Sequence, residues 1–329
     1  MYLLLLLVAV QATSALPAHG RVDTVHLHST ALGVDKSVLV YLPPSYDTSG
    51  RSYPSLYYLH GGGGNERTWL DRFHIGLVVD SLIATGLPEA ILVLPDGDTG
   101  YWTDWVNPTG FANRCATDSM LIALQEQAAT WCVKYGRYET YVASEVVPVV
   151  DHHYRTARDR DQRGIAGVSM GGYGAFFLAL RHPDLWAAAV SHSGVLQPLY
   201  IGPHPFKHPP TYASNVDEIL AAWDGNRRPL FIAEFGSDTA TWWARDPLRQ
   251  LMRLLRQHQR LPLLYFDVGT SDRFADQSRA FADTLRRLGI EYRFAEWPGG
   301  HDWTYWGAHA PAGLVWLLTQ VASSKVGAH

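Results

Sequence analysis

Short runs of apolar residues alternate along this chain with segments whose apolar positions recur at helical spacing. Continuous apolar runs of strand length are typical of parallel strands that are buried on both faces of a sheet. Such runs occupy residues 55–59, 90–94, 163–168, 186–191 and 263–269. Between the first two runs, Ile75, Val79 and Leu82 share one face of a predicted helix. Strands that alternate with helices predict an α/β fold with a mostly parallel central sheet and helices on both faces.

Three segments depart from this alternation. Residues 22–42 hold two β-rich stretches separated by Ala31-Leu32-Gly33, which predicts an antiparallel N-terminal hairpin. Residues 98–137 are rich in tryptophan and hold both cysteines, so we interpret them as an insertion over one face of the sheet. Residues 202–210 contain four prolines and predict an irregular loop. The chain shows no internal repeat and no low-complexity linker, so we expect residues 19–329 to form a single domain.

The first residues of the chain resemble a secretory signal. An apolar run at residues 2–10 is followed by small residues up to position 15. This is the pattern of the hydrophobic segment and cleavage zone of a signal peptide, and the run is too short to span a bilayer as a helix. We therefore expect a signal peptide over residues 1–18, no membrane span, and a secreted or periplasmic protein.

The cysteine content agrees with export. The chain has two cysteines, Cys115 and Cys132, within one segment. An even number of cysteines in an exported chain predicts a disulfide bond. A disulfide that closes a loop of this size stabilises the folded state by up to about 3 kcal/mol. Two separate buried thiols are the alternative.

Composition and motifs exclude several partners. Among 329 residues there are 27 Lys and Arg against 31 Asp and Glu, a formal net charge of -4, with no basic block, so nucleic acid is not an expected partner. His152 and His153 are adjacent, His204 and His208 lie in the proline-rich loop, and no H-E-x-x-H motif occurs. We expect neither a catalytic metal nor any other cofactor.

Residues 167–171, Gly-Val-Ser-Met-Gly, fit the G-x-S-x-G pattern of a nucleophile elbow. In such an elbow the serine lies on a sharp, strained turn between a strand and a helix. The predicted strand at 163–168 leads into the pattern, and apolar residues from Met170 to Leu178 follow it with helical spacing. The context predicts Ser169 as a nucleophile, with the backbone N–H of Met170 as one donor of an oxyanion hole.

A serine nucleophile needs a base, which in this fold follows it in the chain after the acid. His301 follows a short predicted strand at residues 292–295 and lies on a glycine-flanked loop, so it is the predicted base. His309 is the alternative, although it falls in a helix-forming stretch. His192 lies too soon after the serine for the expected order.

Two aspartates are candidates for the acid that orients the base. Asp272 follows the predicted strand at 263–269, and a single strand then separates it from His301. Asp238 follows residues 229–235, which are interpreted as a second possible strand and turn. We prefer Asp272 because the spacing of one strand between acid and base is the one that the fold requires.

Further stretches resemble a known family. Besides the elbow, residues 40–46, the Leu-His-Gly-Gly-Gly-Gly loop at 59–64, and residues 138–141, 181–184, 269–272 and 300–303 are similar to the putative-esterase family of α/β-hydrolases. This family includes feruloyl and acetylxylan esterases, S-formylglutathione hydrolases and mycolyltransferases. The resemblance implies Ser169 as nucleophile, Asp272 as acid and His301 as base, with N–H groups of Gly62 and Met170 forming the oxyanion hole.

The predicted function is a secreted serine ester hydrolase that acts through an acyl-enzyme, on feruloyl or acetyl esters of polysaccharides or on small esters. An acyltransferase, a peptidase or a thioesterase of the S-formylglutathione type with the same triad is the alternative, and a non-catalytic binding module is a third. Candidates for substrate binding are Gly61, Trp102, Trp105, Trp303 and Trp306. Each tryptophan is equally compatible with packing in the core.

Overall fold

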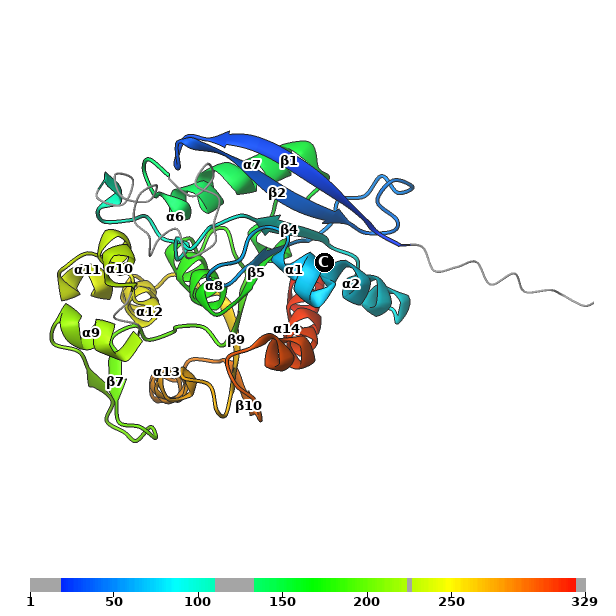
Figure 1. Cartoon of the computed structure of the whole chain (residues 1–329). Coiled ribbons are helices and arrows are strands. Elements are labelled where there is room, and N and C mark those ends of the chain that lie inside the picture. The colour runs from blue at the N-terminus through cyan, green and yellow to red at the C-terminus, as the bar shows by residue number, and fades with distance from the viewer. Residues whose placement is uncertain (1–18, 110–132, 224–226, 324–329) are drawn as a thin grey trace, which may run out of the picture.

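The computed structural model describes residues 19–109, 133–223 and 227–323 (Figure 1). Within these residues, eight strands form one sheet. In spatial order they are β1 (Arg21–Ser29), β2 (Val34–Leu42), β4 (Ile91–Pro95), β3 (Ser55–Leu59), β5 (Arg163–Val168), β6 (Ala188–His192), β9 (Leu263–Gly269) and β10 (Arg293–Trp297). β2 is antiparallel to both β1 and β4, and all other neighbours are parallel. The sheet confirms the predicted α/β-hydrolase architecture with an antiparallel N-terminal hairpin.

The hairpin turns where the sequence predicted. The N–H of Gly33 donates to the carbonyl of Ser29 over 2.7 Å, and Gly33 has a φ of 74°, in the left-handed region that glycine adopts without strain. β3, β5 and β9 have the predicted bounds, because each is a short apolar segment limited by proline or polar residues.

Helices cover both faces of the sheet, and the side chains of each strand alternate between them. On β3, Leu56 and Tyr58 pack with one helical layer, whereas Tyr57 and Leu59 pack with the other. The first layer consists of α1 (Thr68–Phe73), α2 (Ile75–Ala84) and α14 (Trp303–Ser323). The second includes α7 (Val147–His153), α8 (Met170–Arg181), α12 (Pro247–Arg256) and α13 (Ala275–Arg287). Figure 1 shows α14 with α1 and α2, on the far side of the sheet from α8.

A long excursion separates β6 from β9. It contains β7 (Tyr200–Gly202), β8 (Thr211–Tyr212), α9 (Val216–Trp223), α10 (Arg228–Phe235) and α11 (Thr239–Trp243), and ends in α12. β7 pairs with β8, so the predicted irregular loop of residues 202–210 connects the two strands of a small ribbon. In Figure 1, α9 to α12 gather at one side of the molecule, away from α14.

One predicted element in this excursion is wrong. Residues 229–235 form most of α10 and are not a strand. Pro229 lies in the first turn of this helix, where the missing N–H of proline costs no intrahelical hydrogen bond. α12 begins at Pro247, and the Asp246 carboxylate caps it by accepting from the N–H of Arg249 over 3.0 Å.

The two ends of the tryptophan-rich segment lie together. Asp104 and Arg137 form an isolated antiparallel bridge, and the N–H of Trp105 donates to the carbonyl of Gly136 over 3.0 Å. α6 (Tyr138–Thr140) and the π-helix η1 (Tyr141–Val146) continue the chain into α7.

Two predictions concern parts of the chain that are not described. Cys115 and Cys132, the predicted disulfide pair, and the predicted signal peptide at residues 1–18 both lie outside the described residues. Among the helices that are described, none has both the length and the apolar character that crossing a bilayer requires.

Candidate active site

The turn between β5 and α8 places Ser169 in a strained backbone conformation. Its φ is 55° and its ψ is -117°, which for a residue with a side chain costs about 1–3 kcal/mol. The N–H of Ser169 donates to the carbonyl of His192 at the end of β6, over 2.8 Å. Attachment to the neighbouring strand holds the turn, so the serine hydroxyl is presented at the carboxyl end of the sheet.

The two glycines of the G-x-S-x-G pattern are required by close backbone contacts. A Cβ atom at Gly167 would lie 2.2 Å from the carbonyl oxygen of Gly171. A Cβ atom at Gly171 would lie 2.3 Å from the carbonyl oxygen of Leu59, at the end of β3. Any side chain at either position would therefore displace the strand, the turn or the helix.

Ser169, His301 and Asp272 form a hydrogen-bonded chain. The distance from Ser169 Oγ to His301 Nε2 is 2.8 Å, and that from His301 Nδ1 to Asp272 Oδ2 is 2.9 Å. The Asp272 side chain is fully buried, and its second oxygen accepts from the N–H of Phe274 over 2.8 Å. A carboxylate that accepts from Nδ1–H leaves Nε2 free to accept the serine proton. The structure thus brings together the three residues predicted for the triad.

The alternative acid and bases lie elsewhere. Asp238 is exposed and caps α11 by accepting from the N–H of Ala240 over 2.9 Å. His309 lies in α14, stacked on the ring of Trp297. His192 is buried and bonded to a different aspartate.

Aromatic rings fix the orientation of the His301 imidazole. Phe274 meets it edge to face at 5.0 Å between ring centres, and Trp306 does so at 4.9 Å. The indole N–H of Trp306 donates to Ser193 Oγ over 3.1 Å, and Trp303 packs edge-on against Trp306. The imidazole is therefore in contact with two aromatic rings, one of which is itself held by a hydrogen bond.

The glycine loop after β3 lies directly against the nucleophile. A Cβ atom at Gly61 would be 3.4 Å from the Cβ of Ser169. His60 fixes this loop: its Nδ1 is 2.8 Å from the carbonyl oxygen of Gly61, and its Nε2 accepts from the N–H of Gly97 over 2.9 Å. This pair of contacts assigns the proton to Nδ1 and orients the peptide that joins Gly61 to Gly62.

Gly62 and Met170 both line the cavity in front of Ser169. Met170 is the first residue of α8, and the N–H groups in the first turn of a helix have no intrahelical acceptor. They carry partial positive charge, which favours a developing oxyanion.

The cavity has a volume of about 520 Å³ and opens at the carboxyl ends of the parallel strands. Besides Ser169, His301 and the glycine loop, its wall includes Asn65, Thr68, Asp71, Arg72, Tyr101, Val168, Arg227, Arg273, Trp303 and Trp306. Of the predicted substrate-binding residues, Gly61, Trp303 and Trp306 are therefore in position to contact a bound molecule.

Trp102 and Trp105 do not line this cavity, which corrects their proposed place on its wall. Both are buried in the core. The Trp102 indole fills the space left by glycines, since a Cβ atom at Gly97 or at Gly174 would lie within 2.5 Å of its ring. Tyr101 reaches the cavity instead. The tryptophan-rich segment thus does contribute to the wall, but through the residue next to the predicted one.

Other residues of the cavity wall carried no motif in the sequence. Arg227 directly precedes α10, and Arg273 directly follows the acid. Because Arg273 directly follows Asp272 in the sequence, its place on the cavity wall could have been predicted: the loop that carries the acid also borders the substrate. The place of Arg227 on the wall could not be predicted in this way, because Arg227 lies in the excursion between β6 and β9, away from any predicted catalytic residue.

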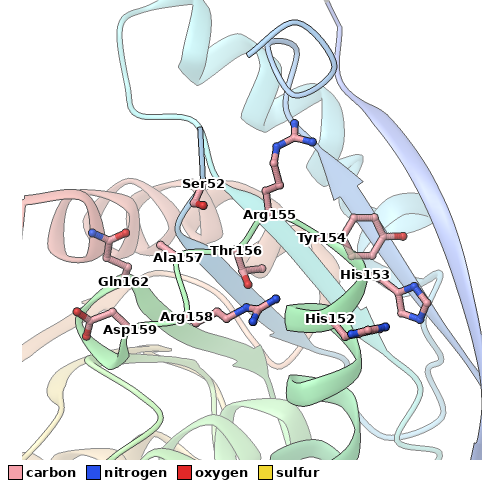
Figure 2. Close-up of a pocket in the computed structure, with 10 residues that line it drawn as sticks. All are labelled: Ser52, His152, His153, Tyr154, Arg155, Thr156, Ala157, Arg158, Asp159 and Gln162. Atoms are coloured by element: carbon pink, nitrogen blue, oxygen red, sulfur yellow. The ribbon is translucent and has the colours of Figure 1, made fainter. Parts of the chain in front are cut away.

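A second hollow, of about 620 Å³, lies at the opposite end of the sheet (Figure 2). Ser52 and Gln162 on its wall precede β3 and β5, whereas Ser169 follows β5, and these strands are parallel. The side chains of His152 and His153 lie side by side at its edge in Figure 2. Ser52, the serine on this wall, has no base as a partner among the described contacts.

Within the three described stretches of the chain, no group of three or more His, Cys, Asp or Glu side chains is arranged to hold a metal ion.

Comparison with known proteins gives consistent matches. A family model described as putative esterase matches residues 29–317. An esterase of Mycobacterium tuberculosis is 29% identical over 282 residues, which cover 83% of this chain and 54% of that protein. The chain therefore spans about half the length of this relative. An acetyl esterase of Caldicellulosiruptor saccharolyticus is 22% identical over 302 residues, covering 89% of this chain and 96% of that protein.

Solved structures share the fold. A ferulic acid esterase matches with a TM-score of 0.65 and 25% identity, covering 92% of this chain and 99% of that chain. An S-formylglutathione hydrolase of Staphylococcus aureus matches with a TM-score of 0.63 and 21% identity, covering 91% and 99% of the two chains.

Proposed function

Because this chain belongs to the putative-esterase family, as its sequence predicted, we propose that it is a serine carboxylic-ester hydrolase with Ser169 as its nucleophile. The observation that carries the proposal is the continuous hydrogen-bonded chain from Ser169 through His301 to Asp272, with distances of 2.8 and 2.9 Å. A serine, a base and an orienting acid at such distances form the arrangement that activates a hydroxyl for acyl transfer.

In the first half of the reaction, Ser169 Oγ attacks the ester carbonyl while His301 Nε2 accepts the hydroxyl proton. The carbonyl oxygen becomes an oxyanion, which the N–H groups of Gly62 and Met170 stabilise. His301 then donates its proton to the oxygen of the departing alcohol, and an acyl-enzyme on Ser169 remains. Asp272 stabilises the charged imidazole throughout and does not itself take the proton.

In the second half, a water molecule takes the place of the alcohol. His301 accepts a proton from the water as its oxygen attacks the acyl carbonyl, and the same oxyanion hole receives the negative charge. The collapse of this intermediate returns the proton to Ser169 Oγ and releases the acid. No step requires a cofactor.

The substrate class that we propose is a feruloyl or acetyl ester, either linked to a polysaccharide or free. Structural similarity to a ferulic acid esterase and sequence similarity to an acetyl esterase support this class. Aromatic groups on the cavity wall, namely Tyr101, Trp303 and Trp306, offer faces against which an aromatic acyl group or a sugar ring can pack. Export through residues 1–18 stays a prediction, which the N-terminal residue of the mature protein would test.

A panel of p-nitrophenyl acetate, p-nitrophenyl butyrate, methyl ferulate and S-formylglutathione tests the proposed activity. We expect turnover of at least one oxygen ester, together with inactivation by a fluorophosphonate that labels Ser169 in the peptide map. Labelling at another residue, or no turnover of any ester or thioester, would contradict the proposal. An added alcohol that captures most of the acyl group would assign the chain to the acyltransferases, and preference for the thioester would assign it to the thioesterases.

A further inference from the structure

The side chain of Lys36 is completely buried. Lys36 belongs to β2, and because Val38 pairs with Pro95 at the end of β4, Lys36 lies beside the segment that follows β4. Its ammonium group donates to Oδ2 of Asp96 over 2.9 Å and also to the carboxylate of Asp98. Although burial disfavours the charge, these two carboxylates hold the pKa of Lys36 above its ordinary value. Desolvation offsets much of the attraction in a buried ion pair, so such a pair is better suited to holding one conformation than to adding net stability.

The backbone of the segment after β4 is strained. Asp98, Tyr101 and Trp102 have φ angles of 48°, 50° and 55°, in the left-handed region that residues with a side chain rarely adopt. Such conformations persist only where surrounding contacts impose them. Lys36 provides one of these contacts at Asp98, and the hydroxyl of Tyr138 provides another by donating to Asp98 Oδ2 over 2.7 Å. The buried ion pair therefore fixes the start of the strained segment.

The strained segment in turn holds the glycine loop of the active site. The N–H of Gly97 donates to His60 Nε2 over 2.9 Å, and the indole N–H of Trp102 donates to the carbonyl of His60 over 3.4 Å. The hydroxyl oxygen of Thr99 accepts from the N–H of Gly63 over 3.2 Å. These bonds hold the glycine loop on both sides of the peptide that carries the proposed oxyanion donor.

His60 passes this constraint to the oxyanion hole. Its Nδ1 donates to the carbonyl of Gly61 over 2.8 Å. The peptide that joins Gly61 to Gly62 is planar and trans, so the direction of its carbonyl fixes the direction of the N–H of Gly62. An oxyanion donor is effective only when it already points at the place where the charge develops. The aim of the Gly62 N–H thus depends on contacts that lead back to Lys36.

We propose that Lys36 is a positioning residue for the oxyanion hole: through Asp96 and Asp98 it holds the segment after β4 in the conformation that aims the N–H of Gly62. The proposal rests on the proposed ester hydrolysis. Lys36 is buried and does not line the cavity at Ser169, so it acts on the reaction only through its neighbours. Loss of Lys36 should therefore weaken binding of the transition state and leave binding of a ground-state ligand unchanged.

Two ketones of the same carbon skeleton separate these two kinds of binding. Phenethyl trifluoromethyl ketone is attacked by Ser169: Oγ bonds to the carbonyl carbon, the hydroxyl proton passes to His301, and the carbonyl oxygen becomes an oxyanion. Phenethyl methyl ketone is far less electrophilic and binds without this addition. The Ki of each ketone is measured at neutral pH by competition with p-nitrophenyl acetate, in the wild type, Lys36→Met and Tyr138→Phe.

We expect Lys36→Met to raise the Ki of the trifluoromethyl ketone about tenfold and Tyr138→Phe to raise it about threefold, because a misdirected donor loses part of its effect. kcat/KM for p-nitrophenyl acetate should fall by the same factors, whereas the Ki of the methyl ketone should stay at its wild-type value. Lys207→Met is the matched control, since it removes the same charge from an exposed position. Val150→Ala, at a buried position of α7, is the control for lowered stability. Both controls should keep the wild-type Ki values.

Tyr138→Phe decides the test alone if Lys36→Met does not fold. The proposal is wrong if the folded variants bind the trifluoromethyl ketone as tightly as the wild type, or if their affinity for the methyl ketone falls equally. It is also wrong if Val150→Ala causes the same loss.

Ser169→Ala separates this inference from the function on which it rests. If Ser169→Ala loses affinity for the trifluoromethyl ketone while Lys36→Met and Tyr138→Phe keep it, only the inference fails. If folded Ser169→Ala binds this ketone as tightly as the wild type and still hydrolyses the ester, the proposed function itself fails.

Discussion

His192 and Asp267 form a completely buried hydrogen-bonded pair, with 2.7 Å between Nδ1 and Oδ2. The second carboxylate oxygen of Asp267 accepts from the hydroxyl of Tyr305 over 3.0 Å. Burial, together with this neighbouring carboxylate, raises the pKa of Tyr305, so its hydroxyl stays protonated as a donor. The three residues join β6, β9 and α14. Because Asp272 follows β9 and His301 precedes α14, this network ties together the two elements that carry the acid and the base.

Tyr305→Phe tests the importance of this connection. The change leaves one oxygen of a buried carboxylate without its donor, so we expect the free energy of unfolding to fall by about 1–3 kcal/mol. We also expect kcat to fall more than KM changes, since the acid and base lose part of their support. Tyr135→Phe, at an exposed position, should change neither the urea midpoint nor kcat. Equal stability and kcat in the two variants would show that the network is without effect on the site.

The assignment of the acid is testable with two matched substitutions. Asp272→Asn removes the charge that stabilises the imidazolium and favours the wrong tautomer, so kcat should fall by about 10³–10⁴-fold. Asp238→Asn should be close to wild type, because asparagine also caps a helix well. The measurement is kcat of both variants for hydrolysis of a p-nitrophenyl ester. If Asp238→Asn lowered kcat more than Asp272→Asn, the role of the acid would be assigned to Asp238.

The elbow predicts a stability effect at Gly171. Alanine there would place a Cβ atom 2.3 Å from a backbone oxygen, a contact that no side-chain movement relieves. We expect Gly171→Ala to lose at least roughly 1–3 kcal/mol of stability. Gly50→Ala, where no atom lies within 4 Å, should stay within about 0.5 kcal/mol of the wild type. Thermal unfolding curves that coincide for the two variants would contradict the described turn.

Asp246 predicts a pH dependence of stability. Complete burial raises the pKa of this helix-capping carboxyl to about 7, and among the described contacts its Oδ2 has no partner. Between the ordinary aspartate pKa and pH 7, the unfolded chain releases the proton while the folded chain keeps it. The folded state therefore binds more protons, and this group makes stability decrease as the pH rises through that window.

Asp246→Asn should remove that contribution while it keeps the cap. We expect the variant to be more stable than the wild type above pH 7, and the advantage to shrink as the pH falls towards 4. Urea unfolding at several pH values measures this difference. A constant difference across the range would show that the carboxyl does not titrate abnormally.

The sequence predicted best those elements whose pattern of apolar residues matches their burial in the folded protein. β3, β5 and β9 are apolar on both faces because helices cover both faces, so their residues alone indicate buried strands. The order of Ser169, Asp272 and His301 could be predicted because parallel strands bring their carboxyl ends to one edge of the sheet.

Other features depend on neighbours that are distant in the sequence. Whether Trp102 faces the cavity or the core is decided by the space above Gly97 and Gly174, which no local pattern encodes. Residues 229–235 are apolar enough to predict a strand, but they form a helix, and Phe231 of this helix packs against the rings of Tyr101 and Trp223.

Ser169→Ala is the sharpest test of Ser169 as the nucleophile of an ester hydrolase. With the fold verified by circular dichroism, the turnover of p-nitrophenyl acetate is measured for the variant and the wild type. We predict a fall in kcat of about 10⁵–10⁶-fold, because the variant lacks the hydroxyl that forms the acyl-enzyme. A folded variant that turns the ester over at the wild-type rate would show that Ser169 is not the nucleophile.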